Sequence, residues 1–387
     1  MEKYFKRYLI MIIVFLSIFS LKGYVVQASP VENTKNSEVE QLYDYITNMK
    51  NEHELLKDMD AKSFVSNYMK KGEGGFSVDK FIKAITTYIL REMIVSLKLM
   101  STLIVISIVC ALITNLEKAF SNERLSNIAY FACYALLIVI MARSFYVGVQ
   151  LARETITRMS NFMLALVPVL IMLLMGIGGI AEATVMDPVV IGAVNISARV
   201  FSNILIPLIS ATFVLQFVNN ITEEFKIEKL TKLLNQVALW GQGILMTIFI
   251  GIMSVRGISS KTLDQVVAKT AKYAVDNFVP IVGKCLSDAV STVAGYSLLL
   301  KNALSSVGLI ILILIVILPV IKIALTALLY KITAALIEPI AEKRLVNSIT
   351  SAGDSLILIT SCLICVSVMF FIMISIIATA GKMAMGG

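Results

Sequence analysis

Long apolar runs separated by short polar stretches dominate the chain from Leu99 to Ala380. Because the hydrocarbon core of a bilayer is about 30 Å thick, a helix that crosses it needs roughly 20 mostly apolar residues. The runs that come near or exceed this length are 99–116, 128–148, 161–181, 188–218, 237–256, 304–330 and 355–380. Helices that are apolar on every face belong in membranes or in the core of large proteins. The pattern therefore predicts an all-α fold, a polytopic membrane helical bundle of about seven spans.

The composition supports this class. Hydrophobic residues make up 58% of the 387 residues and charged residues 16%, whereas a soluble domain carries about 25% charged residues. The net charge is +8, but the basic residues are spread over the predicted loops. Such charges set topology and contact anionic headgroups. The sequence therefore predicts that the chain is embedded in a lipid bilayer and that it does not bind nucleic acid.

Residues 1–28 have the features of a secretory signal peptide. A basic start precedes an apolar core at Tyr8–Leu21, and small residues allow cleavage after Ala28. The alternative is an uncleaved anchor that runs to Val26, although Lys22 interrupts it. Either arrangement places the next segment outside the cytoplasm.

Residues 29–95 form the predicted extracytoplasmic region. Apolar spacing predicts one helix over Glu38–Lys57 and a second that Asp60 caps and that reaches Met69. Gly72–Gly75 then breaks the chain before a third helix that starts at Ser77. The third helix suits a position on the membrane surface, and a small helical hairpin packed on the bundle is the alternative.

Two apolar runs, 188–218 and 307–337, are too long for one plain span and too short for two. Pro207 interrupts the first and Pro319 the second. Interrupted helices of this kind line cavities in transporters and channels. The alternative is an ordinary proline kink, with snorkelling lysines in the second run.

The stretch 259–303 has a polarity between that of a loop and that of a span. It fits two amphipathic helices, joined at Pro280–Gly283, that lie in the interface or re-enter the membrane. Polar residues at membrane depth generally face protein or water. The candidate residues of a polar path are therefore Asn277, Pro280, Gly283, Asp288, Lys301 and Asn302. Structural interface helices without a path are the alternative.

Residue types that catalysis or metal binding would need are scarce. The sole histidine, His53, fits a solvated surface position, and no zinc-protease, phosphate-loop or serine-hydrolase motif occurs. Cys362 and Cys365 have redox or metal spacing, but they sit in an apolar run and fit packing positions better. The sequence predicts no enzyme, no cofactor and no metal site.

Three segments resemble the stage III sporulation protein AE family of spore-forming bacteria. They are Phe81–Phe120, Met159–Gly179 and Thr270–Gly308. The most specific elements are N-F-x-P-x-x-G at Asn277–Gly283 and the leucine-rich element that ends in Lys301-Asn302.

The resemblance implies an integral membrane subunit of a secretion-like channel complex that links mother cell and forespore and is required for endospore formation. It implies a place in the mother-cell membrane around the forespore. The implied partners are other stage III sporulation operon proteins, including a separate ATPase subunit, and stage II sporulation protein Q through the complex. The alternative function is an autonomous small-molecule permease. A permease should contain an internal repeat, and the two 31-residue runs resemble each other only loosely.

Overall fold

The computed structural model describes residues 31–50, 60–71, 78–120, 123–177, 180–221, 227–278 and 282–380. Within these ranges the chain is helical and contains no strand, which confirms the all-α prediction. The chain divides into two compact units, Met1–Glu38 and Val39–Gly387. The predicted signal peptide 1–28 and His53 lie outside the described residues. Everything below concerns the second unit.

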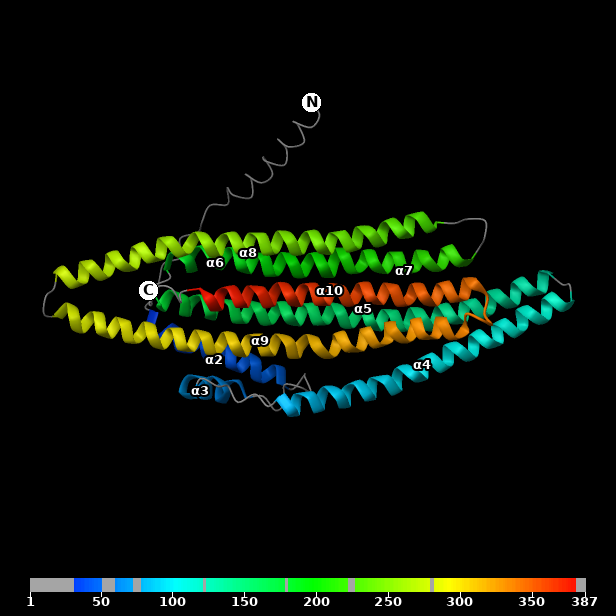
Figure 1. Ribbon diagram of the computed structural model, residues 1–387, viewed down its shortest axis with the longest axis horizontal. Coiled ribbons are helices and arrows are strands. Elements are labelled where there is room, and N and C mark those ends of the chain that lie inside the picture. Colours follow the sequence, from blue (N-terminus) through cyan, green and yellow to red (C-terminus); the bar gives the residue numbers. More distant parts are fainter. Residues whose placement is uncertain are drawn as a thin grey trace, which may run out of the picture. The chain divides into compact units, whose positions relative to one another are not determined.

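Helices build this unit, which includes α2 from Val39 on (Figure 1). In chain order they are α2 (Val31–Lys50), α3 (Ala61–Lys71), α4 (Val78–Phe120), α5 (Glu123–Gly176), α6 (Ile180–Val200), the π-helical turn η2 (Phe201–Leu205), α7 (Ile206–Ile221), α8 (Glu228–Phe278), α9 (Val282–Ile337) and α10 (Lys343–Thr379).

Six helical segments of the described chain are long and apolar enough to cross a membrane. They are Phe81–Ile113, Tyr134–Gly176, Pro188–Asn219, Glu228–Ser254, Thr292–Ile337 and Lys343–Thr379. The sequence predicted about seven spans because it separated 128–148 from 161–181. In the structure both lie in the continuous helix α5, although 161–181 extends beyond its end at Gly176.

The segment 149–160 explains this difference. It is polar enough to resemble a loop, but it contains neither glycine nor proline, so nothing in it breaks a helix. Side chains one turn apart also support it, since Gln150 donates to Glu154 at 2.9 Å and Arg158 lies 3.9 Å from Glu154. The polar residues of 149–160 therefore end an apolar run, but they do not end the helix α5.

The run 188–218 is a helix that widens at one turn. Pro207 has no N–H to donate to the carbonyl of Asn203, and just before it the N–H of Ile206 bonds to the carbonyl of Phe201 in π-helical geometry. In the run 307–337, α9 continues through Pro319. In both runs the chain remains helical across its proline. This agrees with the alternative of an ordinary proline kink rather than an interrupted helix.

The N-terminal helices bury part of their surface in the same hydrophobic core as the long helices. Leu42, Ile46, Phe64 and Val65 are all buried there, and α3 packs against α9. As predicted, Asp60 caps α3, because its Oδ1 accepts the N–H of Lys62 at 3.1 Å. The predicted third helix is the start of α4, which runs without a break into the first candidate span.

Helices α5, α9 and α10 form the centre of the packing (Figure 1). The contact between α9 and α10 is the most extensive, and α5 packs against both. Helix α4 covers α5 and α9, while α8 contacts α6, α7 and α10. A Cβ on Gly353 would lie 3.1 Å from the carbonyl oxygen of Ala327, so a glycine lets α10 approach α9 closely.

Hydrogen bonds between side chains tie α10 to its neighbours. The hydroxyl groups of Tyr134 and Ser348 lie 2.9 Å apart, and Ser355 donates to Gln216 at 3.3 Å. Ser361 donates to Gln242 at 2.6 Å. In an apolar medium such bonds hold helices together where the hydrophobic effect between them is weak. They therefore help to fix the register of α10 against α5, α7 and α8.

Candidate functional site

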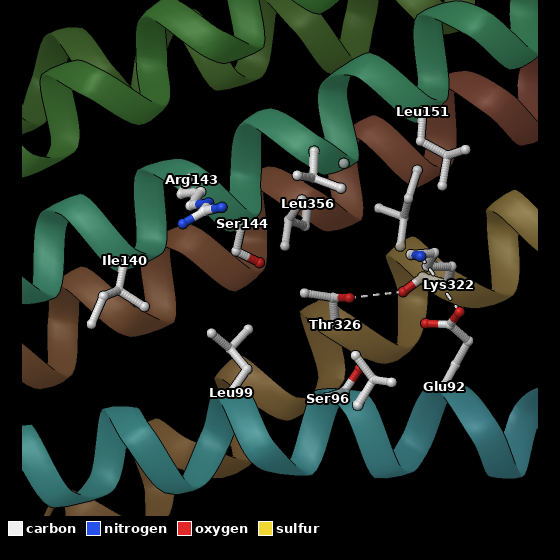
Figure 2. A pocket seen from close by; sticks show the side chains of 14 residues that line it. Glu92, Ser96, Leu99, Ile140, Arg143, Ser144, Leu151, Lys322, Thr326 and Leu356 are labelled. Atoms are coloured by element: carbon white, nitrogen blue, oxygen red, sulfur yellow. Dashed lines mark hydrogen bonds and ion pairs between the residues drawn. The ribbon is translucent and has the colours of Figure 1, made fainter.

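A cavity of about 450 Å³ lies between α4, α5, α9 and α10 (Figure 2). Its size falls in the range of about 300–1,000 Å³ that small-molecule sites occupy. The apolar part of its lining consists of Val95, Leu99, Ile140, Val147, Gly148, Leu151, Ile323 and Leu356. The polar part consists of Glu92, Ser96, Arg143, Ser144, Lys322 and Thr326. A mostly apolar lining with a few polar groups is typical of a binding site.

An ion pair joins α4 and α9 at one end of the cavity. The Nζ of Lys322 lies 3.4 Å from Oε1 of Glu92 (Figure 2). The side chain of Glu92 is 9% exposed and that of Lys322 is 38% exposed, so the carboxylate is the more deeply desolvated partner. Acids within membrane helices generally pair in this way.

Arg143 lines the cavity from α5 and carries a second positive charge. Within the ranges that the structure describes, Arg143 forms no ion pair, while Lys322 and Glu92 balance each other. The charged lining groups therefore sum to one positive charge. Figure 2 shows Arg143 on α5 beside Ser144, away from Glu92 and Lys322.

The sequence places Glu92 and Arg143 near the ends of apolar runs, whereas Lys322 lies within one. In α4 no charged residue occurs from Leu99 to Ile113, and in α5 none occurs from Phe131 to Ala142. Arg143 is the first charge after the α5 run, and Glu92 comes one to two turns before the α4 run. Packing of α4 against α5 brings both ends to the same cavity. The cavity thus lies where both helices change from apolar to charged.

The predicted path residues lie elsewhere. Asn277 is in the last turn of α8, while Gly283 and Asp288 are in the first turns of α9. The described part of α8 ends at Phe278 and that of α9 begins at Val282, and the residues of the predicted break between them, 279–281, lie outside the described residues. Pro280 lies outside the described residues, and the side chains of 255–291 are not described. Whether these residues share a path thus stays a prediction.

Lys301 is fully buried and lies against the end of α10. Its Nζ donates to the carbonyl oxygen of Ile377 at 3.2 Å and to that of Ala380. The neighbouring Asn302 is half-buried, and its Oδ1 has no hydrogen-bond partner among the described residues. Lys301 therefore anchors a helix end, a contact that sequence reasoning missed.

Sequence reasoning also missed the cavity. Glu92, Arg143 and Lys322 come from three helices that are far apart in the chain, so no local motif joins them. Their common signal is a charge within or beside an apolar run. That signal also selects residues such as Lys301, so by itself it does not separate a cavity from a structural anchor.

The described cysteines are free thiols. Cys362 is buried in α10 and Cys365 is partly buried one turn later. Among the described residues, no group of three or more histidine, cysteine or acidic side chains could hold a metal ion.

Six helical segments of the described chain are long and apolar enough to cross a membrane, and side-chain hydrogen bonds link α10 to α7 and α8. These features define a polytopic helical membrane protein. The family model of stage III sporulation protein AE matches residues 59–381, so the chain belongs to that family. A relative from Bacillus subtilis (strain 168), the stage III sporulation protein AE of that organism, is 36% identical over 314 residues, which cover 81% of this chain and 79% of the relative. No solved structure matches the chain. Membership of this family implies a role in sporulation.

Proposed function

We propose that this chain is a membrane subunit, without catalytic activity of its own, of a secretion-like channel complex that links mother cell and forespore. The match to the sporulation family over residues 59–381 carries the proposal. The six candidate spans suit a subunit embedded in a bilayer. The sequence holds no phosphate-binding loop, so a separate ATPase subunit would supply any energy for transport.

In this proposal the chain lies in the mother-cell membrane around the forespore, and its N-terminal region is extracytoplasmic. Its partners are the other stage III sporulation operon proteins and, through the complex, stage II sporulation protein Q. The exposed apolar side chains of α4 and α8, for example Ile94, Val105, Trp240 and Ile244, suit contact with lipid or with neighbouring subunits.

Purification of the tagged full-length chain from sporulating cells tests this role. After mild cross-linking and extraction in detergent, we expect the other operon proteins, including the ATPase subunit, to co-purify with the chain. A similarly tagged multi-span protein made at the same stage is the control and should not recover them. Recovery of a tagged, functional chain without any of these proteins would contradict the proposal.

An autonomous permease is the second candidate, and the charged cavity is the observation that favours it. The test is uptake of small anions into vesicles that contain only the purified chain. Uptake that saturates and that needs no other protein would favour the permease over the channel subunit.

A further inference from the structure

We propose that the cavity between α4, α5, α9 and α10 binds a singly charged phosphate group, with Arg143 as the residue that holds it. The ligand class is a phosphate that belongs either to an anionic phospholipid or to a small soluble molecule. This inference goes beyond the channel role, because it concerns a binding property of the chain alone.

The charge of the cavity is the first argument. Glu92 and Lys322 lie 3.4 Å apart and cancel each other, so the charge of Arg143 remains. Arg143 is exposed, so an anion from outside the chain can reach it. No acidic side chain of the described residues pairs with it. One bound anionic group would balance the cavity.

The shape of the donors is the second argument. A guanidinium group presents N–H donors in a planar fork that matches phosphate oxygens. The hydroxyl-bearing side chains of Ser96 on α4 and Ser144 on α5 line the same cavity (Figure 2). Hydroxyl groups are small donors that commonly complete the coordination of an anion. The cavity lining therefore offers one guanidinium group and two hydroxyl groups as donors to an anion.

The position of the cavity along the helices is the third argument. Uncharged apolar runs lie beside it in α4 (Leu99–Ile113) and in α5 (Phe131–Ala142). Arg143 follows the α5 run directly and lies within the candidate span Tyr134–Gly176, from which a long arginine side chain can reach lipid headgroups. The apolar side chains of Leu99, Ile140 and Val147 can meet the glycerol and the first methylene groups of a lipid.

The paired residues limit what can bind. Because Lys322 is already neutralised by Glu92, a second anion finds no free positive charge at that end of the cavity. Glu92 also repels a second anion. The site therefore selects one charge, and it is Arg143 rather than Lys322 that determines binding.

Native mass spectrometry of the purified full-length chain tests the lipid source. The chain is mixed in neutral detergent with phosphatidylglycerol or with phosphatidylcholine, which has no net charge. We expect the wild type to retain one phosphatidylglycerol in preference to phosphatidylcholine. Arg143→Gln should weaken this binding by about tenfold or more, because a hydrogen bond to a charged group is lost.

Arg153→Gln is the matched control. Arg153 lies on the same helix, is exposed and does not line the cavity, so its loss should leave the binding unchanged. Inorganic phosphate, added to the delipidated chain, tests the soluble source. A rise in the unfolding temperature that disappears in Arg143→Gln would assign the site to soluble phosphate.

Val147→Trp keeps the charges of the cavity and fills it from α5. This variant is the second test if Arg143→Gln does not give a folded chain. It should abolish the binding of whichever ligand the wild type takes. Equal binding by the wild type, Arg143→Gln and Val147→Trp would overturn the proposal. So would the absence of any preference for phosphatidylglycerol together with no response to phosphate.

Discussion

At the scale of single residues, Lys301 shows how a cation is held inside an apolar bundle. The last carbonyl groups of a helix have no partner within that helix and carry partial negative charge. Lys301 of α9 donates to two such groups at the end of α10, those of Ile377 and Ala380. This contact explains a lysine that is 0% exposed in a segment of high hydropathy.

We expect Lys301→Met to destabilise the chain by about 1–3 kcal/mol, because the carbonyl groups at the end of α10 lose a donor. The measurement is the unfolding temperature of the purified chain in detergent. Lys229→Met, at an exposed position near the start of α8, is the control and should change little. Unchanged stability together with a sporulation defect would instead favour the predicted polar path through Lys301.

Gly353 and Gly192 give opposite predictions for the same substitution. A Cβ at Gly353 would meet the backbone oxygen of Ala327 at 3.1 Å, whereas a Cβ at Gly192 would meet nothing within 4 Å. Gly353→Ala should cost about 1–3 kcal/mol through overpacking, while Gly192→Ala should stabilise its helix by up to about 1 kcal/mol. Unfolding temperatures of the two variants check this. The same shift in both would refute the close contact of α9 and α10.

At the scale of elements, continuity of α5 is the main difference from the sequence prediction. The apolar runs 128–148 and 161–181 predicted two separate spans. In the structure the first run and the second as far as Gly176 lie in one helix of 54 residues. A helix of that length extends about 81 Å, far beyond the bilayer core of about 30 Å. The polar segment between the runs is therefore a helical part of the molecule rather than a loop.

Spin labels at Leu136 and Met175, both exposed on α5, distinguish the two arrangements. We expect a separation of about 58 Å for one continuous helix, against about 10–20 Å for two packed spans. Pulsed electron resonance on a variant that lacks the five native cysteines measures this distance. Labels at Ile313 and Leu328 of α9 give about 22 Å in both cases and serve as the control. A short distance between 136 and 175 would show that α5 is interrupted.

At the scale of the whole molecule, burial differs among the candidate spans. In the most apolar 18-residue segment of α4 and in that of α8, only 22% of the residues are buried. In the corresponding segment of α5, 67% are buried. Lipid or partner subunits must therefore cover α4 and α8, while α5 is largely covered by the chain itself.

The sequence by itself determined the class of the protein, since apolar runs of about 20 residues have few stable alternatives to helices in a bilayer. It also predicted the cap at Asp60, because capping acts over a few residues. Only the tertiary structure decided that Lys301 meets the end of α10, that Glu92 meets Lys322, and that Arg143 lines the same cavity as that pair. Each of these contacts joins residues more than 50 positions apart, and their meeting depends on how the helices pack.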